Sequence, residues 1–263
     1  MIAFPEAKIN LGLRIVRKKP DGYHDLETCF TKIPLCDALE ILPSEMFLWD
    51  GSEEIPEDNL VVKAYRALQA LKPELPPVNI LLRKRIPSGA GLGGGSSDSS
   101  SALRLLNGLL TDPLSAGELH GIARSLGADC PFFLKDEPQY AEGIGDLLEP
   151  ISLPLKGLCL TLVFPELFIS TKEAFGSITP REPSEHLSET IRRPSEEWKE
   201  HLKNDFEEAL FPKYPILGEI KAELYRRGAL YASMSGSGST MYALSDHELT
   251  LPPHHNARHL RFE

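Results

Sequence analysis

The segment at residues 87–97, Pro-Ser-Gly-Ala-Gly-Leu-Gly-Gly-Gly-Ser-Ser, constrains the fold more than any other part of the chain. Five of the seven positions from Gly89 to Gly95 are glycine, which has no Cβ to keep a ligand away from the backbone and tolerates positive φ. Residues 78–86 are typical of a strand, and the apolar spacing that begins at Ala102 predicts a helix. The segment is therefore a loop between a strand and a helix.

A loop in this position predicts a binding site for a phosphate chain. The first N–H groups of the following helix have no acceptor within the helix, and its positive dipole end points into the same space. Ser96, Ser97 and Asp98 are expected to cap the first turn. A flexible linker is the ordinary alternative, although linkers seldom join a strand to a well-patterned helix. The predicted phosphate-binding residues are Pro87, Ser88, Gly89, Ala90, Gly91, Leu92, Gly93, Gly94, Gly95, Ser96 and Ser97.

Other phosphate-binding motifs fit the segment less well. Gly89, Gly91 and Gly94 match a dinucleotide fingerprint, but the acid expected about 20 residues later could only be Asp112, which precedes a proline. The chain has no Gly-x-x-x-x-Gly-Lys-Ser/Thr motif, and it lacks the His-Arg-Asp and Asp-Phe-Gly motifs of protein kinases.

Composition narrows the class of partner. The 263 residues are 41% hydrophobic and 25% charged, with a formal net charge of −10 and a pI near 5.4. This charge repels nucleic acids and anionic membranes, so neither is expected as a partner. The four cysteines show no spacing typical of zinc or disulfides. Without a recognisable leader or membrane span, we expect a cytoplasmic protein.

Apolar spacing predicts the other elements and a domain boundary near Pro150, which divides the chain into residues 1–150 and 151–263. A helix capped by Asp58 or Asn59 should end before Lys72. We expect residues 180–200 to be a mobile connection, residues 196–208 an exposed acidic face, and the tail with His254, His255 and His259 a solvated segment. Further strands are expected at residues 7–16, 158–164, 230–234 and 241–244, and helices at residues 116–126, 205–210 and 217–227.

Three other segments give the chain a family resemblance: Ala-Lys-Ile-Asn-Leu-Gly-Leu at residues 7–13, Gly-Ala-Asp-Cys-Pro at 127–131, and Met-Ser-Gly-Ser-Gly-Ser-Thr at 234–240. Together with the glycine loop they resemble the motif set of the GHMP kinases. Pro-Asp-Gly-Tyr-His at residues 20–24 narrows the resemblance to the branch that phosphorylates a cytidine diphosphate derivative of methylerythritol in the non-mevalonate isoprenoid pathway. The resemblance covers residues 7–244, with serines at 99–101 where small alanines are common.

The resemblance implies an α+β fold of two domains, a ribosomal-protein-like N-terminal domain and a ferredoxin-like C-terminal domain, with ATP and substrate in the cleft between them. It also implies Mg²⁺ with the ATP phosphates, although no acidic residue stands out as a protein ligand. The segment at residues 235–240 would support the nucleotide loop and close the substrate cleft. A monomer and a homodimer remain equally open.

Residue roles follow from the same resemblance. Asp129 would act as the base, although an isolated Asp also suits a turn cap. Lys8 would lie beside it and stabilise the developing alkoxide, although edge strands also carry lysines. Asn10 and Thr171 would hydrogen-bond the polyol. The remaining implied contacts are to cytosine from Tyr23 by stacking, from His24 by hydrogen bonding and from Phe175 on the opposite face, and to adenine from Asn59 and Lys84.

Three alternatives stay open at this stage. A GHMP kinase could act on another small alcohol. A dinucleotide oxidoreductase would need an early βαβ unit and the missing ribose-binding acid. An RNA-binding module would share architecture with ribosomal proteins, but the negative charge and the lack of a basic stripe disfavour it.

Overall fold

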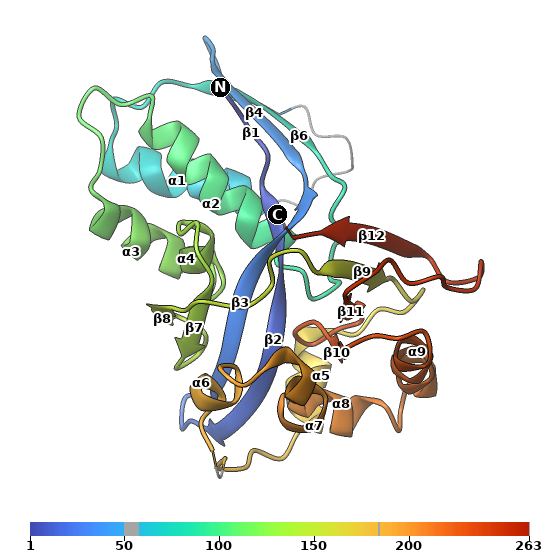
Figure 1. The fold of residues 1–263 in the computed structure, drawn as a ribbon. Helices are drawn as coiled ribbons and strands as arrows, with labels where there is room; N and C mark the ends of the chain where they lie inside the picture. Colours follow the sequence, from blue (N-terminus) through green and yellow to red (C-terminus); the bar gives the residue numbers. More distant parts are fainter. Residues whose placement is uncertain (50–57, 184, 263) are drawn as a thin grey trace. The chain divides into compact units, whose positions relative to one another are not determined.

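The computed structural model describes residues 1–49, 58–183 and 185–262. Two compact units interleave along the chain (Figure 1). Unit 1 comprises Met1–Ala7, Leu35–Ser88 and Gly93–Asp136, and unit 2 comprises Lys8–Pro34, Gly89–Leu92 and Glu137–Glu263. The single sequence boundary proposed near Pro150 falls within unit 2 and stays a prediction.

Unit 1 is a four-stranded sheet packed against helices. The strand order is β1 (Ile2–Ala3), β4 (Ala38–Pro43), β6 (Val78–Arg83) and β5 (Leu48–Trp49), and only the β5–β6 pair is parallel among those described. Val78, Ile80 and Leu82 are buried while Asn79 and Leu81 are less so, which is the period-2 pattern of a strand with one face in the core. The helices are α1 (Leu60–Leu71), α2 (Gly94–Asn107), α3 (Ala116–Leu126) and α4 (Cys130–Phe133).

Local capping signals explain the helix boundaries in unit 1. Asn59 caps α1 as predicted, because its side-chain oxygen accepts from the N–H of Val61 at 2.9 Å. Ser115 and Glu118 form a capping box at the start of α3, so this helix has the predicted bounds. The predicted capping of α2 by Ser96, Ser97 and Asp98 is wrong. These residues lie inside the helix, which begins at Gly94 after Gly93.

Unit 2 contains two sheets. One has the order β2 (Glu6–Lys18), β3 (His24–Cys36), β7 (Gln139–Glu142) and β8 (Leu147–Pro150), and its long strands β2 and β3 run side by side in Figure 1. The other is antiparallel with the order β10 (Tyr231–Met234), β11 (Met241–Ser245), β9 (Cys159–Val163) and β12 (Ala257–Arg261). The helices are α5 (Thr171–Ser177), α6 (Leu187–Thr190), η1 (Ser195–Glu197), α7 (Trp198–His201), α8 (Asp205–Leu210) and α9 (Pro215–Arg226).

The prediction of a mobile connection at residues 180–200 is wrong for the part that the structure describes. Leu187 and Trp198 have no exposed surface, and the indole N–H of Trp198 donates to the carbonyl of Arg193 at 3.0 Å. The segment contains α6, η1 and the start of α7. These helices are short and lie among prolines and acidic residues, which dominate the sequence pattern.

Two further expectations for unit 2 need correction. The acidic face at residues 196–208 is not uniformly exposed, because Glu207 is buried. The histidine-bearing tail is not merely solvated, because β12 pairs with β9 and His259 lies within hydrogen-bond distance of the Thr161 hydroxyl, at 3.1 Å. Among the described helices, none combines the length and apolar character that crossing a membrane requires.

Candidate active site

The glycine loop has the backbone that the sequence predicts. Gly89, Gly91 and Gly93 have φ values of +66°, +78° and +68°, which L-residues with a Cβ rarely adopt. Gly93 is the N-cap of α2 and has no side chain with which to cap it. The first N–H groups of α2 therefore have no acceptor within the helix, and this is the arrangement that binds anions.

The segment at residues 235–240 packs against the glycine loop and hydrogen-bonds to it. A Cβ on Gly91 would lie 2.1 Å from the carbonyl oxygen of Ser235, so only glycine allows this contact. The Ser235 hydroxyl donates to the carbonyl of Gly91 at 2.9 Å, and the N–H of Thr240 donates to the carbonyl of Ala90 at 3.3 Å. The expected contact of this segment with the glycine loop is confirmed, whereas nucleotide binding by the loop and the role of the segment in closing a cleft stay predictions.

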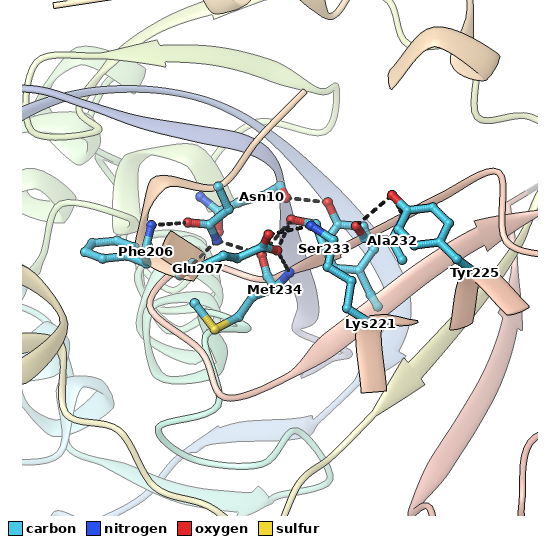
Figure 2. Close-up of polar contacts among 11 residues, drawn as sticks. Asn10, Phe206, Glu207, Lys221, Tyr225, Ala232, Ser233 and Met234 are labelled. Atoms are coloured by element: carbon cyan, nitrogen blue, oxygen red, sulfur yellow. Dashed lines mark hydrogen bonds and ion pairs between the residues drawn. The ribbon is translucent and has the colours of Figure 1, made fainter. Parts of the chain in front are cut away.

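Buried polar side chains fix the supporting segment in turn (Figure 2). The Glu207 carboxylate accepts from the Ser233 hydroxyl at 2.9 Å and from the N–H of Met234 at 2.8 Å, and it pairs with Lys221. The amide of Asn204 donates to the carbonyls of Met234 and Gly236, each at 2.8 Å. These contacts set the course of the chain from β10 into residues 235–240.

Lys8 connects β2 to the loop. Its N–H donates to the carbonyl of Leu92 at 3.0 Å, and its ammonium donates to Oδ1 of Asn10 at 2.5 Å. The ammonium also lies 4.9 Å from the centre of the Phe30 ring. Lys8 is only 4% exposed, so it is not the solvent-facing edge lysine of the ordinary alternative.

Asn10 is held at three atoms. Its side-chain amide donates to the Thr28 hydroxyl at 3.0 Å, its Oδ1 accepts from Lys8, and its main-chain carbonyl accepts from the Tyr242 hydroxyl at 2.6 Å. A Cβ on Gly236 would lie 3.3 Å from Asn10 Oδ1, which places the same oxygen against the segment that supports the loop. Lys8, Asn10, the loop residues 89–92 and this segment all belong to unit 2.

Unit 1 contributes a buried ionic cluster at the two ends of the loop. Lys84 is the residue that follows β6. Its ammonium lies 2.6 Å from the carboxylate of Asp98 on α2 and also pairs with Asp37. Asp37 further accepts the N–H of Ile86 at 2.8 Å. Lys84 therefore has a structural role beside its predicted adenine contact, which stays a prediction.

Burial sets the ionisation of this cluster. It raises the pKa of Asp98 to about 7 against the opposing effect of the Lys84 charge. Oδ1 of Asp98 is buried and finds no hydrogen-bond partner in the part of the chain that the structure describes. Burial alone would lower the pKa of Lys84, but Asp98 and Asp37 outweigh it and raise that pKa.

Asp129 occupies the N-cap position of α4 without capping it through its side chain. The turn-cap alternative is therefore not realised on this helix. The next residue, Cys130, is buried, and its carbonyl accepts from the Ser100 hydroxyl of α2 at 2.8 Å, which fastens the Gly127–Pro131 turn to that helix. Asp129 belongs to unit 1 and Lys8 to unit 2, and their predicted proximity stays a prediction.

The predicted cytosine-binding residues are partly brought together. The His24 ring stacks on Phe175 of α5 with centroids 5.0 Å apart and planes at 28°, and Phe175 meets Phe206 edge-on. Burial lowers the pKa of His24, and Lys18 lowers it further. Tyr23 is 61% exposed, and Thr171 is the exposed first residue of α5. His24 thus occupies a face of Phe175 that a base would need.

Sequence reasoning missed Thr28, Asp37, Asn204 and Glu207. An Asn directly before a predicted helix is a capping signal, and the Asn204 side chain does accept from the N–H of Phe206 at 3.0 Å. That signal does not reveal the second function of its amide. The partners of the other three lie far away in the sequence and leave no local pattern.

Comparison with known proteins places the chain in a family. The family models for the GHMP kinases N terminal domain and the GHMP kinases C terminal match residues 59–137 and 187–251. The 4-diphosphocytidyl-2-C-methyl-D-erythritol kinase of Bacteroides thetaiotaomicron is 54% identical over 96% of this chain and 94% of its own. The same enzyme of Cytophaga hutchinsonii is 43% identical over 93% of this chain and 92% of its own.

Solved structures agree. The crystal structure of a 4-(cytidine 5'-diphospho)-2C-methyl-D-erythritol kinase matches with a TM-score of 0.82 and 32% identity, covering 93% of this chain and 90% of that one. Methanococcus jannaschii mevalonate kinase shares the fold with a TM-score of 0.72 at 14% identity, and the match covers 100% of this chain and 98% of that one. The predicted GHMP kinase fold is confirmed. The chain belongs to the 4-diphosphocytidyl-2-C-methyl-D-erythritol kinase family of the GHMP kinases.

Proposed function

We propose that the protein transfers the γ-phosphate of ATP to the 2-hydroxyl of 4-(cytidine 5'-diphospho)-2-C-methyl-D-erythritol, a step of the non-mevalonate isoprenoid pathway. The observation that carries the proposal is the direct bond between the glycine loop and Lys8, at the carbonyl of Leu92. It joins a phosphate-binding backbone to a buried cation in one unit. The 54% identity to a relative that bears this enzyme name supports the choice of substrate.

The loop would bind the triphosphate with its backbone. Phosphoryl transfer needs the phosphates held in line with the attacking hydroxyl and their charge stabilised. N–H groups at the start of α2 serve both needs, because they are fixed before ATP arrives. The positive φ values at Gly89, Gly91 and Gly93 allow the chain to curve around the phosphates.

The residues of this loop would hold Mg²⁺ only together with the phosphates of bound ATP. Residues 87–97 offer hydroxyl and backbone groups but no carboxylate, and the adjacent Asp98 is committed to Lys84. The phosphate oxygens would therefore hold most of the ion, with Ser96 and Ser97 as the hydroxyl donors nearest in sequence. Bound in this way, Mg²⁺ would neutralise charge on the phosphates.

Lys8, Asn10 and Asp129 would act on the substrate hydroxyl. We assign Asp129 as the base that accepts its proton. The Lys8 ammonium would stabilise the alkoxide that develops on the attacking oxygen. Asn10 orients that ammonium through its Oδ1 and would hydrogen-bond the polyol, with Thr171 as a second polyol contact.

The cytidine end would be recognised by rings of unit 2. A base stacked on Phe175 has to move the His24 ring from the face that it covers. Once displaced, the imidazole can hydrogen-bond the pyrimidine edge while Tyr23 covers the other face of the base. The lowered pKa of His24 favours the neutral ring, which can both donate and accept.

One experiment separates this proposal from its main alternative, a GHMP kinase acting on another small alcohol. The purified protein is given ATP and Mg²⁺ with the cytidylylated methylerythritol, homoserine, mevalonate or galactose in parallel, and ADP release and product mass are measured. We expect phosphorylation of the cytidine substrate alone. Faster phosphorylation of another alcohol would assign the alternative.

A further inference from the structure

The orientation of the Asn10 amide decides what Lys8 meets. The oxygen and nitrogen ends of a side-chain amide have nearly the same shape but opposite hydrogen-bonding character. With Oδ1 toward Lys8, the ammonium has an acceptor at 2.5 Å. With the amide reversed, two N–H donors would face an ammonium that can only donate. Something in the structure must therefore select the first orientation.

The Thr28 hydroxyl makes this selection. Thr28 lies on β3 with no exposed surface, and its hydroxyl donates to the carbonyl of Gly12 at 2.6 Å. A hydroxyl has one proton, so toward its other neighbour it can act only as an acceptor. That neighbour is Nδ2 of Asn10, at 3.0 Å. The bond to Gly12 thus turns the NH₂ end of Asn10 toward Thr28 and the oxygen end toward Lys8.

We propose that Thr28 is a positioning residue for phosphoryl transfer, which it serves through Asn10 by fixing the acceptor that holds the Lys8 ammonium. The inference rests on the proposed role of Lys8 in transfer. The chain of contacts runs from Gly12 through Thr28 and Asn10 to Lys8, and every member belongs to unit 2. The same position could instead serve only sheet packing, so the test has to separate the hydroxyl from the side-chain volume.

The hydroxyl is tested with Thr28→Val, which keeps the branched shape on a strand, and with Thr28→Ser, which keeps the hydroxyl. Thr31→Val is the matched control, because Thr31 is also buried on β3 and its hydroxyl bonds only the carbonyl of Lys32, at 3.4 Å, among the hydrogen bonds described. Each variant is measured for kcat, for KM of ATP and for melting temperature. Asn10→Ala, alone and combined with Thr28→Val, completes a double-mutant cycle.

We expect Thr28→Val to lower kcat about tenfold to a hundredfold, the effect of a misplaced catalytic group, with KM for ATP unchanged. Thr28→Ser and Thr31→Val should retain parental kcat. On the Asn10→Ala background, Thr28→Val should cause no further loss, because its route to Lys8 is already cut.

Several results would overturn the inference: parental kcat in Thr28→Val, an equal loss in Thr28→Ser, or the same added loss on the Asn10→Ala background. If Thr28→Val does not fold, Thr28→Ala against Thr28→Ser asks the same question, since the two differ by one hydroxyl. Lys8→Ala keeps the two proposals apart. If Lys8→Ala has normal kcat, the proposed function of Lys8 is wrong. If Lys8→Ala has a low kcat while Thr28→Val keeps the parental kcat, only the proposed role of Thr28 is wrong.

Discussion

The main-chain N–H of Lys8 and the carbonyl of Leu92 form a hydrogen bond of 3.0 Å between β2 and the glycine loop. This bond fixes the backbone of Lys8 against the loop, while the ammonium at the other end of the side chain donates to Asn10. A group that stabilises charge in a transition state works best when its position is set before the substrate arrives.

Replacing Lys8 with alanine should reduce kcat about 10²-fold or more and leave ATP affinity nearly unchanged, because the charge acts on the hydroxyl side and the backbone bond to the loop survives. Steady-state kinetics and calorimetry with ATP measure the two quantities separately. Lys63→Ala is the control, since that lysine pairs with the exposed Asp58. A large loss of ATP affinity at unchanged kcat would assign Lys8 to the nucleotide instead.

The Asp129→Asn variant should fold and bind ATP but lose kcat by about 10² to 10⁴, the usual effect of removing a positioned base. Asparagine retains the size of the side chain, and Asp129 makes no capping bond that α4 would miss. Asp112→Asn, at a surface carboxylate paired with Lys72, is the control. Near-normal turnover in folded Asp129→Asn would remove this residue from the mechanism.

A pair of glycine variants tests the loop as a phosphate site. Gly93→Val forces a branched residue to φ +68° at the start of α2 and should abolish ATP binding while a cytidine ligand still binds. Gly117→Ala, on α3 and outside the loop, should bind both, because nothing lies within 4 Å of a Cβ at that position. Calorimetry with each ligand separates the effects, and equal loss of both ligands in Gly93→Val would make the loop a structural element only.

Phe175→Ala should raise KM for the cytidine substrate about tenfold to a hundredfold, because stacking contributes about 1–3 kcal/mol per base, and should leave KM for ATP unchanged. His24→Ala should in addition relax the preference for cytosine over uracil, since recognition then depends on stacking alone. Phe211→Ala removes a ring that packs on the same core cluster and serves as the control. Parental behaviour in both test variants would place the cytosine pocket elsewhere.

Asp98 should make stability depend on pH. Its pKa in the folded state is about 7, above its ordinary value, so the folded protein holds this proton more tightly than the unfolded chain does. The stability that the protonated Asp98 contributes to the folded state is therefore fully present below about pH 4 and is lost as the pH rises toward 7. The Asp98→Asn variant has no carboxyl at this position and keeps its stability over this pH range. The free energy of unfolding of the variant minus that of the parent, measured by urea titration, should therefore increase between about pH 5 and pH 8. A constant difference would mean that Asp98 ionises normally.

The elements that sequence reasoning placed best have their signals close by in the chain. Residues 116–126 form a helix with the predicted bounds because Ser115 and Glu118 cap it reciprocally. The strand β3 was not predicted, and its partner β7 lies far along the chain, as in the pair Thr28 and Ala141. The local hairpin of β7 and β8 was also missed. Residues 180–200 were misjudged because their contacts are distant: the buried Trp198 meets Tyr231 edge-on, and the N–H of Leu187 donates to Glu27.

The candidate site divides in a similar way. The glycine loop could be predicted from local chemistry, because few other patterns place positive φ before a helix. Lys8 and Asn10 came from the family resemblance, since a polar residue in an apolar strand has several ordinary explanations. Thr28 could not have been found by either route, because its importance lies in the direction of one hydroxyl proton, toward Gly12.

The contact between Gly91 and Ser235 joins positions that lie 144 residues apart. During synthesis, the ribosome releases β6, the glycine loop and α2 long before it releases residues 235–240, which pack against the loop. A nascent chain that stops before Ser235 has neither the carbonyl against which Gly91 packs nor the hydroxyl that bonds it. The loop can take its final shape only after Ser235 has been synthesised, so a phosphate site at the loop would form long after the loop itself has emerged.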